Sequence, residues 1–278
     1  MISVLIPTYN YNCYPFVKEL HNQFIATNIK FQIICLDDGS KSDFNIENNK
    51  INNLTNAYFE ELKKNFGRSA IRNLLVKKAA FEWLLFLDAD GFPKNKNFIQ
   101  KYLDLIKSEN KYIGYVGGRI HKKDGRKSLR VKFGIKREEL SVNERNKNPY
   151  RFLFTSNMML NKSVFKQTNF NENLKGYGYE DVLFGNSIRD KGYKVLHINN
   201  PVYHLQIEQN KIFIDKTKKD ANKDGIYAFV NENGLFVKRI QRRVDGGLDI
   251  ISDNKEYPMQ IASKSDITTD KNRPARSK

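Results

Sequence analysis

Two aspartates separated by one alanine, Asp88 and Asp90, follow a run of large apolar residues in the stretch FLDADGF (86–92). Aspartate often stands where a chain leaves a sheet, because its side chain caps turns and helix starts. Two carboxylates at a strand end also suit a divalent cation, since Mg²⁺ and Mn²⁺ bind oxygen and keep several waters. The motif by itself leaves both interpretations open.

A second acidic pair, Glu180 and Asp181, stands in GYGYEDVLFG (176–185), where a glycine-rich loop is expected to lead into a helix. Negative charge is favoured at a helix start by the helix dipole. A carboxylate in such a place is also able to take a proton from an attacking hydroxyl group. The pair therefore has both a structural and a catalytic interpretation.

Short apolar runs alternate with segments of helical spacing through the first half of the chain. The runs predict strands at 3–7, 31–38, 82–90 and 112–118, and the spacing predicts helices at 14–25, 68–80 and 97–107. This alternation is typical of a parallel sheet covered on both faces, in which ligands bind beyond the carboxyl ends of the strands. The polar residues expected at that edge are Thr8, Tyr9, Asn10, Asp37, Asp38, Asp88 and Asp90.

The second half is less regular and suggests the domain boundaries. A catalytic domain is predicted over 1–205, with a nucleotide-binding part at 1–118 and an acceptor-binding part at 119–205. A helical, basic extension is predicted over 206–251. The last segment, 252–278, has few large apolar residues and is predicted to be a flexible tail.

The composition restricts the partners and the compartment. A formal net charge of +17 over 278 residues implies anionic partners: a nucleotide, a phospholipid surface, an anionic glycan or nucleic acid. Cys13 and Cys35 are too few for a disulfide framework and fit a reducing compartment. The N-terminal stretch lacks a basic region and contains Pro7, so neither a signal peptide nor a membrane anchor is expected. These features predict a cytoplasmic protein, soluble or peripheral at the inner face of the cell membrane.

Six motifs at predicted strand ends and helix starts follow one another along the chain: VLIPTYN (4–10), LDDGS (36–40), NFGRSAIRN (65–73), FLDADG (86–91), GYGYEDVLFG (176–185) and VYHL (202–205). Their order and spacing resemble the family two nucleotide-sugar glycosyltransferases of the GT-A fold. The fifth motif is similar to the Gly-Trp-Gly-x-Glu-Asp segment of galactosyl- and N-acetylgalactosaminyltransferases. The resemblance runs from Ile2 to about His204. It implies an α/β fold with a Rossmann-like mixed sheet flanked by helices, to which the helical C-terminal extension is added.

The resemblance implies a binding site for a UDP-sugar donor. Pro7, Thr8 and Tyr9 would surround the base, and Asp38 would bind the uracil or the ribose. An aromatic ring stacks on a base and a carboxylate accepts hydrogen bonds from ring N–H or ribose hydroxyl groups, so the residue types suit these roles. Arg72 would hold the nucleotide or orient the aspartates of the DxD motif.

The resemblance also implies a metal cofactor, Mn²⁺ or Mg²⁺, that offsets the charge of the diphosphate leaving group. Asp90 would be a direct ligand, and Asp88 would act through water or the ribose of the donor. His204 would supply an imidazole, and a mixed shell of oxygen and nitrogen favours manganese. Arg68 has no predicted role.

On the acceptor side, the resemblance implies that Asp181 is the general base and that Glu180 contacts acceptor hydroxyls. Tyr177 and Tyr179 would form a wall that stacks on sugar. The predicted function is inverting transfer of a hexose or N-acetylhexosamine to a hydroxyl of a saccharide acceptor. A cell-envelope or lipid-linked glycan is the expected acceptor.

Three other kinds of protein share some of these features. An EF-hand loop starting at Asp88 would need glycine and glutamate where the chain has Pro93 and Ile99, which excludes it. A haloacid-dehalogenase-like phosphatase also has Asp-x-Asp-Gly after a strand, but it expects Thr or Val in place of Phe92. A non-enzymatic nucleic-acid-binding protein would explain the charge, although zinc-ligand sets and RRM signatures are missing from the sequence. Basic and apolar residues interleaved between 216 and 243 predict salt-sensitive contact with an anionic membrane.

Overall fold

The computed structural model describes residues 1–108, 111–121, 131, 134–136, 138–174, 180–206, 225–231, 234–242, 248–251 and 260–262. The chain divides into two compact units, Met1–Ile207 and Glu208–Lys278. Among the described helices, none is long and apolar enough to cross a membrane.

The first unit is built on a seven-stranded sheet in the order β3-β2-β1-β4-β8-β6-β9. Its strands are β1 (Ile2–Thr8), β2 (Phe31–Asp37), β3 (Ala57–Glu61), β4 (Trp83–Leu87), β6 (Gly114–Val116), β8 (Asn157–Asn161) and β9 (Val195–His197). Strand β8 pairs antiparallel with both β4 and β6, while all other pairs in this sheet are parallel. The predicted mixed α/β sheet is confirmed, and β8 is its one reversed strand.

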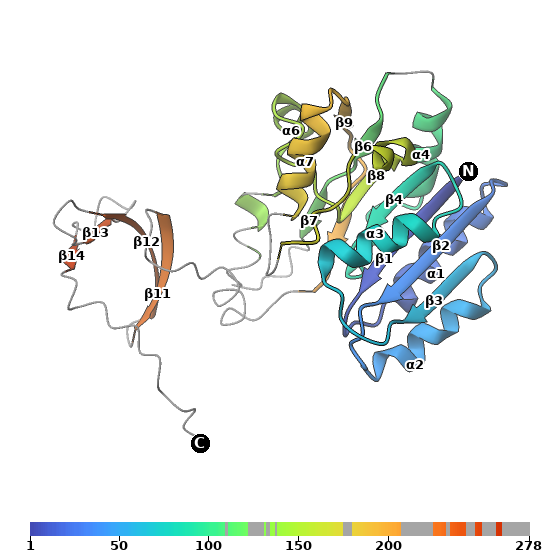
Figure 1. Ribbon diagram of the computed structural model, residues 1–278, viewed down its shortest axis with the longest axis horizontal. Helices are drawn as coiled ribbons and strands as arrows, with labels where there is room; N and C mark the ends of the chain where they lie inside the picture. The colour runs from blue at the N-terminus through green and yellow to red at the C-terminus, as the bar shows by residue number, and fades with distance from the viewer. Residues whose placement is uncertain are drawn as a thin grey trace. The chain divides into compact units, whose positions relative to one another are not determined.

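Helices cover both faces of this sheet (Figure 1). Alternate residues of β1 point to opposite faces, as the two-residue period of a strand requires. Val4 and Ile6 pack in the cluster that contains α1 (Tyr14–Ile25) and α4 (Phe98–Lys107). Leu5 packs in the cluster that contains α3 (Arg68–Lys78) and α7 (Glu180–Asp190). Near-continuous apolar strands are therefore explained by burial on both sides.

The helices begin where local sequence favours a start. Proline stands in the first turn of α1, where its fixed φ and missing N–H cost nothing. The short helix α6 (Val142–Lys147) begins with a capping box between Ser141 and Glu144. Three further short helices are α2 (Phe44–Asn48), η1 (Asn49–Asn53) and η2 (Lys162–Lys166).

A small second sheet lies next to the DxD motif. It consists of β5 (Gly91–Pro93), β10 (Val202–His204) and β7 (Arg119–His121), with β10 in the middle. In its register His204 lies opposite both Gly91 and His121. Strands of three residues are too short for a clear periodic pattern, which is why the sequence does not predict this sheet.

The second unit contains a four-stranded antiparallel sheet of β11 (Gly225–Asn231), β12 (Gly234–Arg242), β13 (Leu248–Ile251) and β14 (Gln260–Ala262). The predicted helical extension over 206–251 is wrong for these residues. β11 and β12 are rich in β-branched and aromatic residues and only two residues separate them, which favours a hairpin over a helix. Strand β14 also falls inside the predicted flexible tail. The rest of that tail and residues 208–224 lie outside the described residues.

Candidate active site

Strands β1, β2 and β4 run in the same direction, so their carboxyl ends meet at one edge of the sheet. Thr8, Asp38 and Asp88 stand at this edge. Because β8 runs the opposite way, its beginning reaches the same edge, and Asn157 at its start pairs with Leu87 at the end of β4. The topology therefore brings together residues that follow three strands and residues that precede a fourth.

The predicted nucleoside-binding residues differ in exposure. Tyr9 is 58% exposed, whereas Thr8 is buried and Pro7 is half-buried within β1. The Thr8 carbonyl accepts a hydrogen bond from the Asp38 N–H at 2.9 Å. Of these residues Tyr9 presents the most open surface for stacking on a base.

Asp38 is buried and fixes the loop that leads into α3. Its carboxylate oxygens accept hydrogen bonds from the N–H groups of Phe66 at 2.7 Å and Gly67 at 2.9 Å. The next residue, Gly39, has a φ of +68°, and a Cβ there would lie 2.4 Å from the backbone carbon of Lys64. Only glycine fits this close contact between the tip of β2 and the loop.

Two arginines on one face of α3 connect the two acidic motifs. The Arg72 guanidinium is buried, with Nη2 3.1 Å from Oδ1 of Asp88 and Nη1 3.8 Å from Oε1 of Glu180. Arg68, one helical turn earlier, donates from Nε to the same Glu180 oxygen. Asp88, which follows β4, and Glu180, at the start of α7, therefore interact with the same arginine, Arg72.

These cations change the ionisation of both carboxyl groups. Burial raises the pKa of Asp88, but Arg72, Arg68, Arg119 and His204 lower it by more, so the net pKa lies below its usual value. The Glu180 pKa is also lowered, because the attraction of Arg68 and Arg72 outweighs burial. Both groups are therefore carboxylates at neutral pH.

Asp181 has the opposite character. Burial raises the pKa of Asp181, and the neighbouring charges of Glu180 and Asp88 raise it further, against the opposing effects of Arg72 and Arg68. The Thr155 hydroxyl donates to Oδ1 of Asp181 at 2.9 Å, and the Thr155 N–H donates to Oδ2 at 3.3 Å. A positioned carboxylate with a raised pKa is a better proton acceptor than an ordinary aspartate.

Asp90 and His204 form a second pair beside this network. The small sheet brings His204 Nε2 to 2.9 Å from Oδ2 of Asp90, and the Asp90 carbonyl accepts the Leu205 N–H. His204 Nδ1 is buried and has no hydrogen-bond partner in the described part of the chain. Within the described residues no group of three or more His, Cys, Asp or Glu side chains is arranged to hold a metal ion. One carboxylate and one imidazole still fit a divalent cation that takes its other ligands from phosphates and water.

Further ionisable side chains border the Asp90–His204 pair. The rings of His121 and His204 are 5.4 Å apart in an edge-to-face arrangement. His121 Nδ1 lies 2.9 Å from Glu139, and Arg119 Nη2 lies 2.7 Å from Glu138. These four residues have no predicted role, because they come from a segment without a recognisable motif.

The structure thus brings the predicted residues Asp88, Glu180, Asp181 and Arg72 into one network and pairs Asp90 with His204. The expected sugar-stacking residues Tyr177 and Tyr179 lie outside the described residues. Sequence reasoning missed Arg68 and Thr155. Arg68 had a signal, because it stands four residues before Arg72 on a helix and so shares its face.

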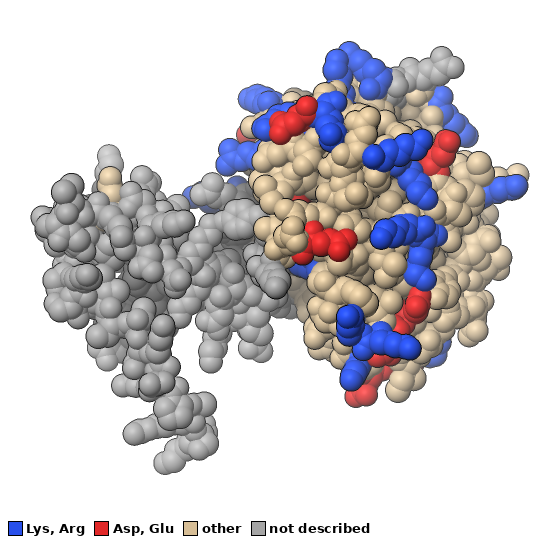
Figure 2. Space-filling view, viewed as in Figure 1, with Lys and Arg blue, Asp and Glu red and all other residues tan. Residues whose placement is uncertain are grey.

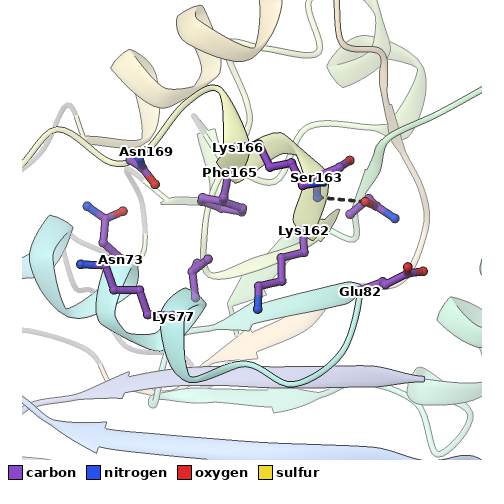
Figure 3. A pocket seen from close by; sticks show the side chains of 10 residues that line it. Asn73, Lys77, Glu82, Lys162, Ser163, Phe165, Lys166 and Asn169 are labelled. Atoms are coloured by element: carbon purple, nitrogen blue, oxygen red, sulfur yellow. Dashed lines mark hydrogen bonds between the residues drawn. The ribbon is translucent and has the colours of Figure 1, made fainter.

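A cavity of 480 Å³ lies at the opposite edge of the sheet (Figure 3). Its walls come from the end of α3, the residue before β4, and the end of β8 with η2; among them are Lys77, Glu82, Asn161, Lys162 and Phe165. Lys162 Nζ donates to the Ala79 carbonyl just after α3, where positive charge complements the helix dipole. This cavity is separate from the carboxylates described above.

Figure 2 shows Lys and Arg side chains spread over the face in view, with Asp and Glu side chains between them. On this face of the described residues the basic side chains do not gather into one patch. The net charge of +17 is therefore no evidence for a single nucleic-acid-binding surface there.

Several known proteins are similar in sequence to part of this chain. Uncharacterised glycosyltransferases of Rickettsia felis, Mycoplasma genitalium and Haemophilus influenzae are 35%, 33% and 32% identical over 122, 112 and 110 residues, which are 40%, 36% and 38% of this chain. The matched parts span 18%, 36% and 42% of the lengths of those relatives, so the chain covers less than half of each.

Two solved structures share the fold. S. aureus TarS 1–349 in complex with UDP-GlcNAc has a TM-score of 0.53 at 22% identity, covering 76% of this chain and 60% of that one. The Pyrobaculum calidifontis mannosyltransferase PcManGT in complex with GDP-Man and Mn²⁺ has a TM-score of 0.53 at 12% identity, covering 78% and 60%.

Two family models match the chain. The Peptidase S24-like model matches residues 189–269, a range that includes β9 and β10 of the first unit and all four strands of the second. The Glycosyl transferase family 2 model matches residues 3–168, which contain the sheet edge with Asp38, Arg72, Asp88 and Thr155. Because this match covers more than half of the chain, the protein belongs to glycosyl transferase family 2.

Proposed function

We propose that the protein transfers a hexose or N-acetylhexosamine from a UDP-sugar to a hydroxyl of a saccharide acceptor, with inversion at the anomeric carbon. The observation that carries the proposal is the meeting of the DxD motif and Asp181 at one sheet edge, where Arg72 joins Asp88 to the acidic pair. A donor bound on the DxD side would present its anomeric carbon to an acceptor on the Asp181 side.

The donor site is assigned to Pro7, Thr8, Tyr9, Asp38 and Arg72. The exposed ring of Tyr9 supports stacking on the base, and the uracil preference is supported by the fold it shares with TarS, which was solved with UDP-GlcNAc. Asp38 already holds the Phe66 and Gly67 N–H groups, so it would use its remaining lone pairs for the uracil or ribose.

Asp90, His204 and Asp88 are assigned to a Mn²⁺ or Mg²⁺ ion. The oxygen and nitrogen donors of Asp90 and His204 support manganese, and the fold relative PcManGT was solved with Mn²⁺. When bound, such an ion offsets the negative charge that develops on the diphosphate leaving group. Asp88 would act through water or the donor ribose, because Arg72 already engages one of its oxygens.

In the reaction, an acceptor hydroxyl attacks the anomeric carbon while the bond from that carbon to the UDP oxygen breaks. The hydroxyl proton moves to Asp181, and UDP leaves with the electron pair. Glu180 is assigned to an acceptor hydroxyl, although Arg68 and Arg72 hold its Oε1, so the other oxygen would make this contact. One displacement needs only one base, which supports inversion.

Because the chain belongs to glycosyl transferase family 2, we no longer propose a phosphatase or a nucleic-acid-binding protein. A cell-envelope or lipid-linked glycan remains the proposed acceptor, reached from the cytoplasm at the inner face of the membrane. Of the basic residues between 216 and 243 expected to contact anionic lipid, those before 225 lie outside the described residues, and Lys238, Arg239 and Arg242 belong to β12.

The proposal is tested by measuring release of the nucleoside diphosphate: UDP from UDP-glucose, UDP-galactose and their N-acetylamino forms, and GDP from GDP-mannose as the comparison donor. Each reaction is run with MnCl₂, with MgCl₂ and with EDTA. We expect turnover of one UDP-sugar with manganese and little with EDTA. Turnover of GDP-mannose alone would replace the uracil assignment, and equal turnover in EDTA would remove the metal from the mechanism.

A further inference from the structure

Thr155 makes two hydrogen bonds to one side chain of the candidate site. Its hydroxyl donates to Oδ1 of Asp181 at 2.9 Å, and its N–H donates to Oδ2 at 3.3 Å. Thr155 is only 1% exposed, so its own donor groups are shielded from water. Both oxygens of Asp181 are thereby fixed by a single residue that stands far from it in the sequence.

The position of Thr155 connects Asp181 to the same strands that hold the DxD motif. Thr155 stands two residues before Asn157, and Asn157 pairs with Leu87, the residue directly before Asp88. Asp181 itself stands in the first turn of α7. The Thr155 contacts therefore fix the start of α7 to the end of β4, and so fix the distance between the two sides of the candidate site.

We propose that Thr155 is a positioning residue for sugar transfer: its hydroxyl and N–H hold the Asp181 carboxylate in the orientation that receives the acceptor proton. This inference rests on the proposed function. Each carboxylate oxygen has two lone pairs, so one bond from Thr155 to each oxygen leaves acceptance capacity for the substrate. Thr155 keeps its own proton throughout, because the proton that moves comes from the acceptor hydroxyl.

The charged groups around Asp181 affect its ionisation. Arg72 and Arg68 approach from α3 and attract the carboxylate, while Glu180 and Asp88 repel it. Arg68 donates to Glu180, and Arg72 donates to Asp88 and to the Arg68 carbonyl. Charge alone does not orient a carboxylate, whereas two directed hydrogen bonds do.

The test compares Thr155→Val, which removes the hydroxyl at nearly constant volume, with Thr155→Ser, which keeps it. Thr27→Val is the matched control, because the Thr27 hydroxyl also donates a hydrogen bond, to the Phe24 carbonyl at the end of α1. The readout is UDP release from the UDP-sugar selected in the screen above. We expect Thr155→Val to lower kcat about 10- to 100-fold, as misplacement of a catalytic group does, with KM for the donor unchanged. Thr155→Ser should recover most of the loss.

A double-mutant cycle with Asp181→Asn separates positioning from a general structural role. If Thr155 acts through Asp181, adding Thr155→Val to Asp181→Asn lowers the residual turnover no further. An additive loss, a normal kcat in Thr155→Val, or a Thr155→Ser variant as slow as Thr155→Val would overturn the inference. Should Thr155→Val fold poorly, Thr155→Ala takes its place at equal folded fraction, judged by thermal unfolding.

Asp181→Asn measured alone distinguishes the two failures. Full turnover in this variant overturns Asp181 as the base, and with it the proposed mechanism. A slow Asp181→Asn beside a normal Thr155→Val leaves the mechanism in place and overturns only the role of Thr155.

Discussion

The buried guanidinium of Arg72 lies 3.1 Å from the carboxylate of Asp88, and its other terminal nitrogen lies 3.8 Å from Glu180. One side chain of α3 thus contacts the DxD motif and the acidic pair of α7. Removing it would leave two carboxylates in a largely buried site with one fewer of the cations that lower their pKa values.

Arg72→Met is therefore expected to destabilise the first unit. We expect a loss on the order of 3 kcal/mol, the lower end for a broken buried ion pair, because a quarter of the Asp88 side chain is exposed. Thermal unfolding measures the effect. Lys50→Met is the control, since the Lys50–Glu47 pair is exposed and should contribute at most about 1 kcal/mol. Equal shifts in both variants would contradict the role of Arg72.

Asp181→Asn is expected to keep donor binding and to lower turnover about 10²- to 10⁴-fold, the usual contribution of a positioned base. Calorimetry measures UDP binding, and a coupled assay of UDP release measures turnover. Asp190→Asn, at the exposed end of the same helix, is the control and should leave both unchanged. Normal turnover in Asp181→Asn would move the base elsewhere, with Glu180 as the next candidate.

The raised pKa of Asp181 predicts that the same variant is more stable than the wild type at neutral pH. The folded state holds the Asp181 proton more tightly than the unfolded state, so Asp181 makes stability fall as pH rises from about 3.9 through the raised folded pKa. Asparagine carries no charge and avoids this loss. We expect Asp181→Asn to raise Tm at pH 7 and to lose that advantage below about pH 3.9. A lower Tm at pH 7 would contradict the direction of the shift.

UDP is expected to raise Tm weakly in EDTA and clearly with MnCl₂, because a metal that contacts the diphosphate tightens binding, and stabilisation grows as ln(1 + [L]/Kd). Asp90→Asn should remove most of the manganese-dependent part. His21→Gln is the control for histidine substitutions, since His21 contacts the Thr55 carbonyl on the surface, whereas His204→Gln should weaken the manganese effect. Equal stabilisation by UDP in EDTA would exclude Asp90 and His204 as metal ligands.

Much of the sheet was predictable, because the apolar runs of β1, β2 and β4 and the helical spacing of α1 and α3 are strong local patterns. The second unit was wrongly predicted to be helical. That prediction relied on its basic residues and did not use the strand-like pattern of β11 and β12. The DxD motif and the acidic pair were found because each is a local motif. Thr155 was not, because the residues FTSN around it acquire meaning only through a contact with a helix 26 positions later.

The reversed direction of β8 changes which kinds of sequence position are able to evolve into site residues. In a sheet whose strands all run one way, new functional side chains arise only in segments that follow a strand. With one strand turned round, a segment that precedes a strand, here the residues before β8, reaches this edge as well. Substitutions in the residues before β8 are therefore able to alter this edge of the sheet without changing the segments that follow β1, β2 and β4.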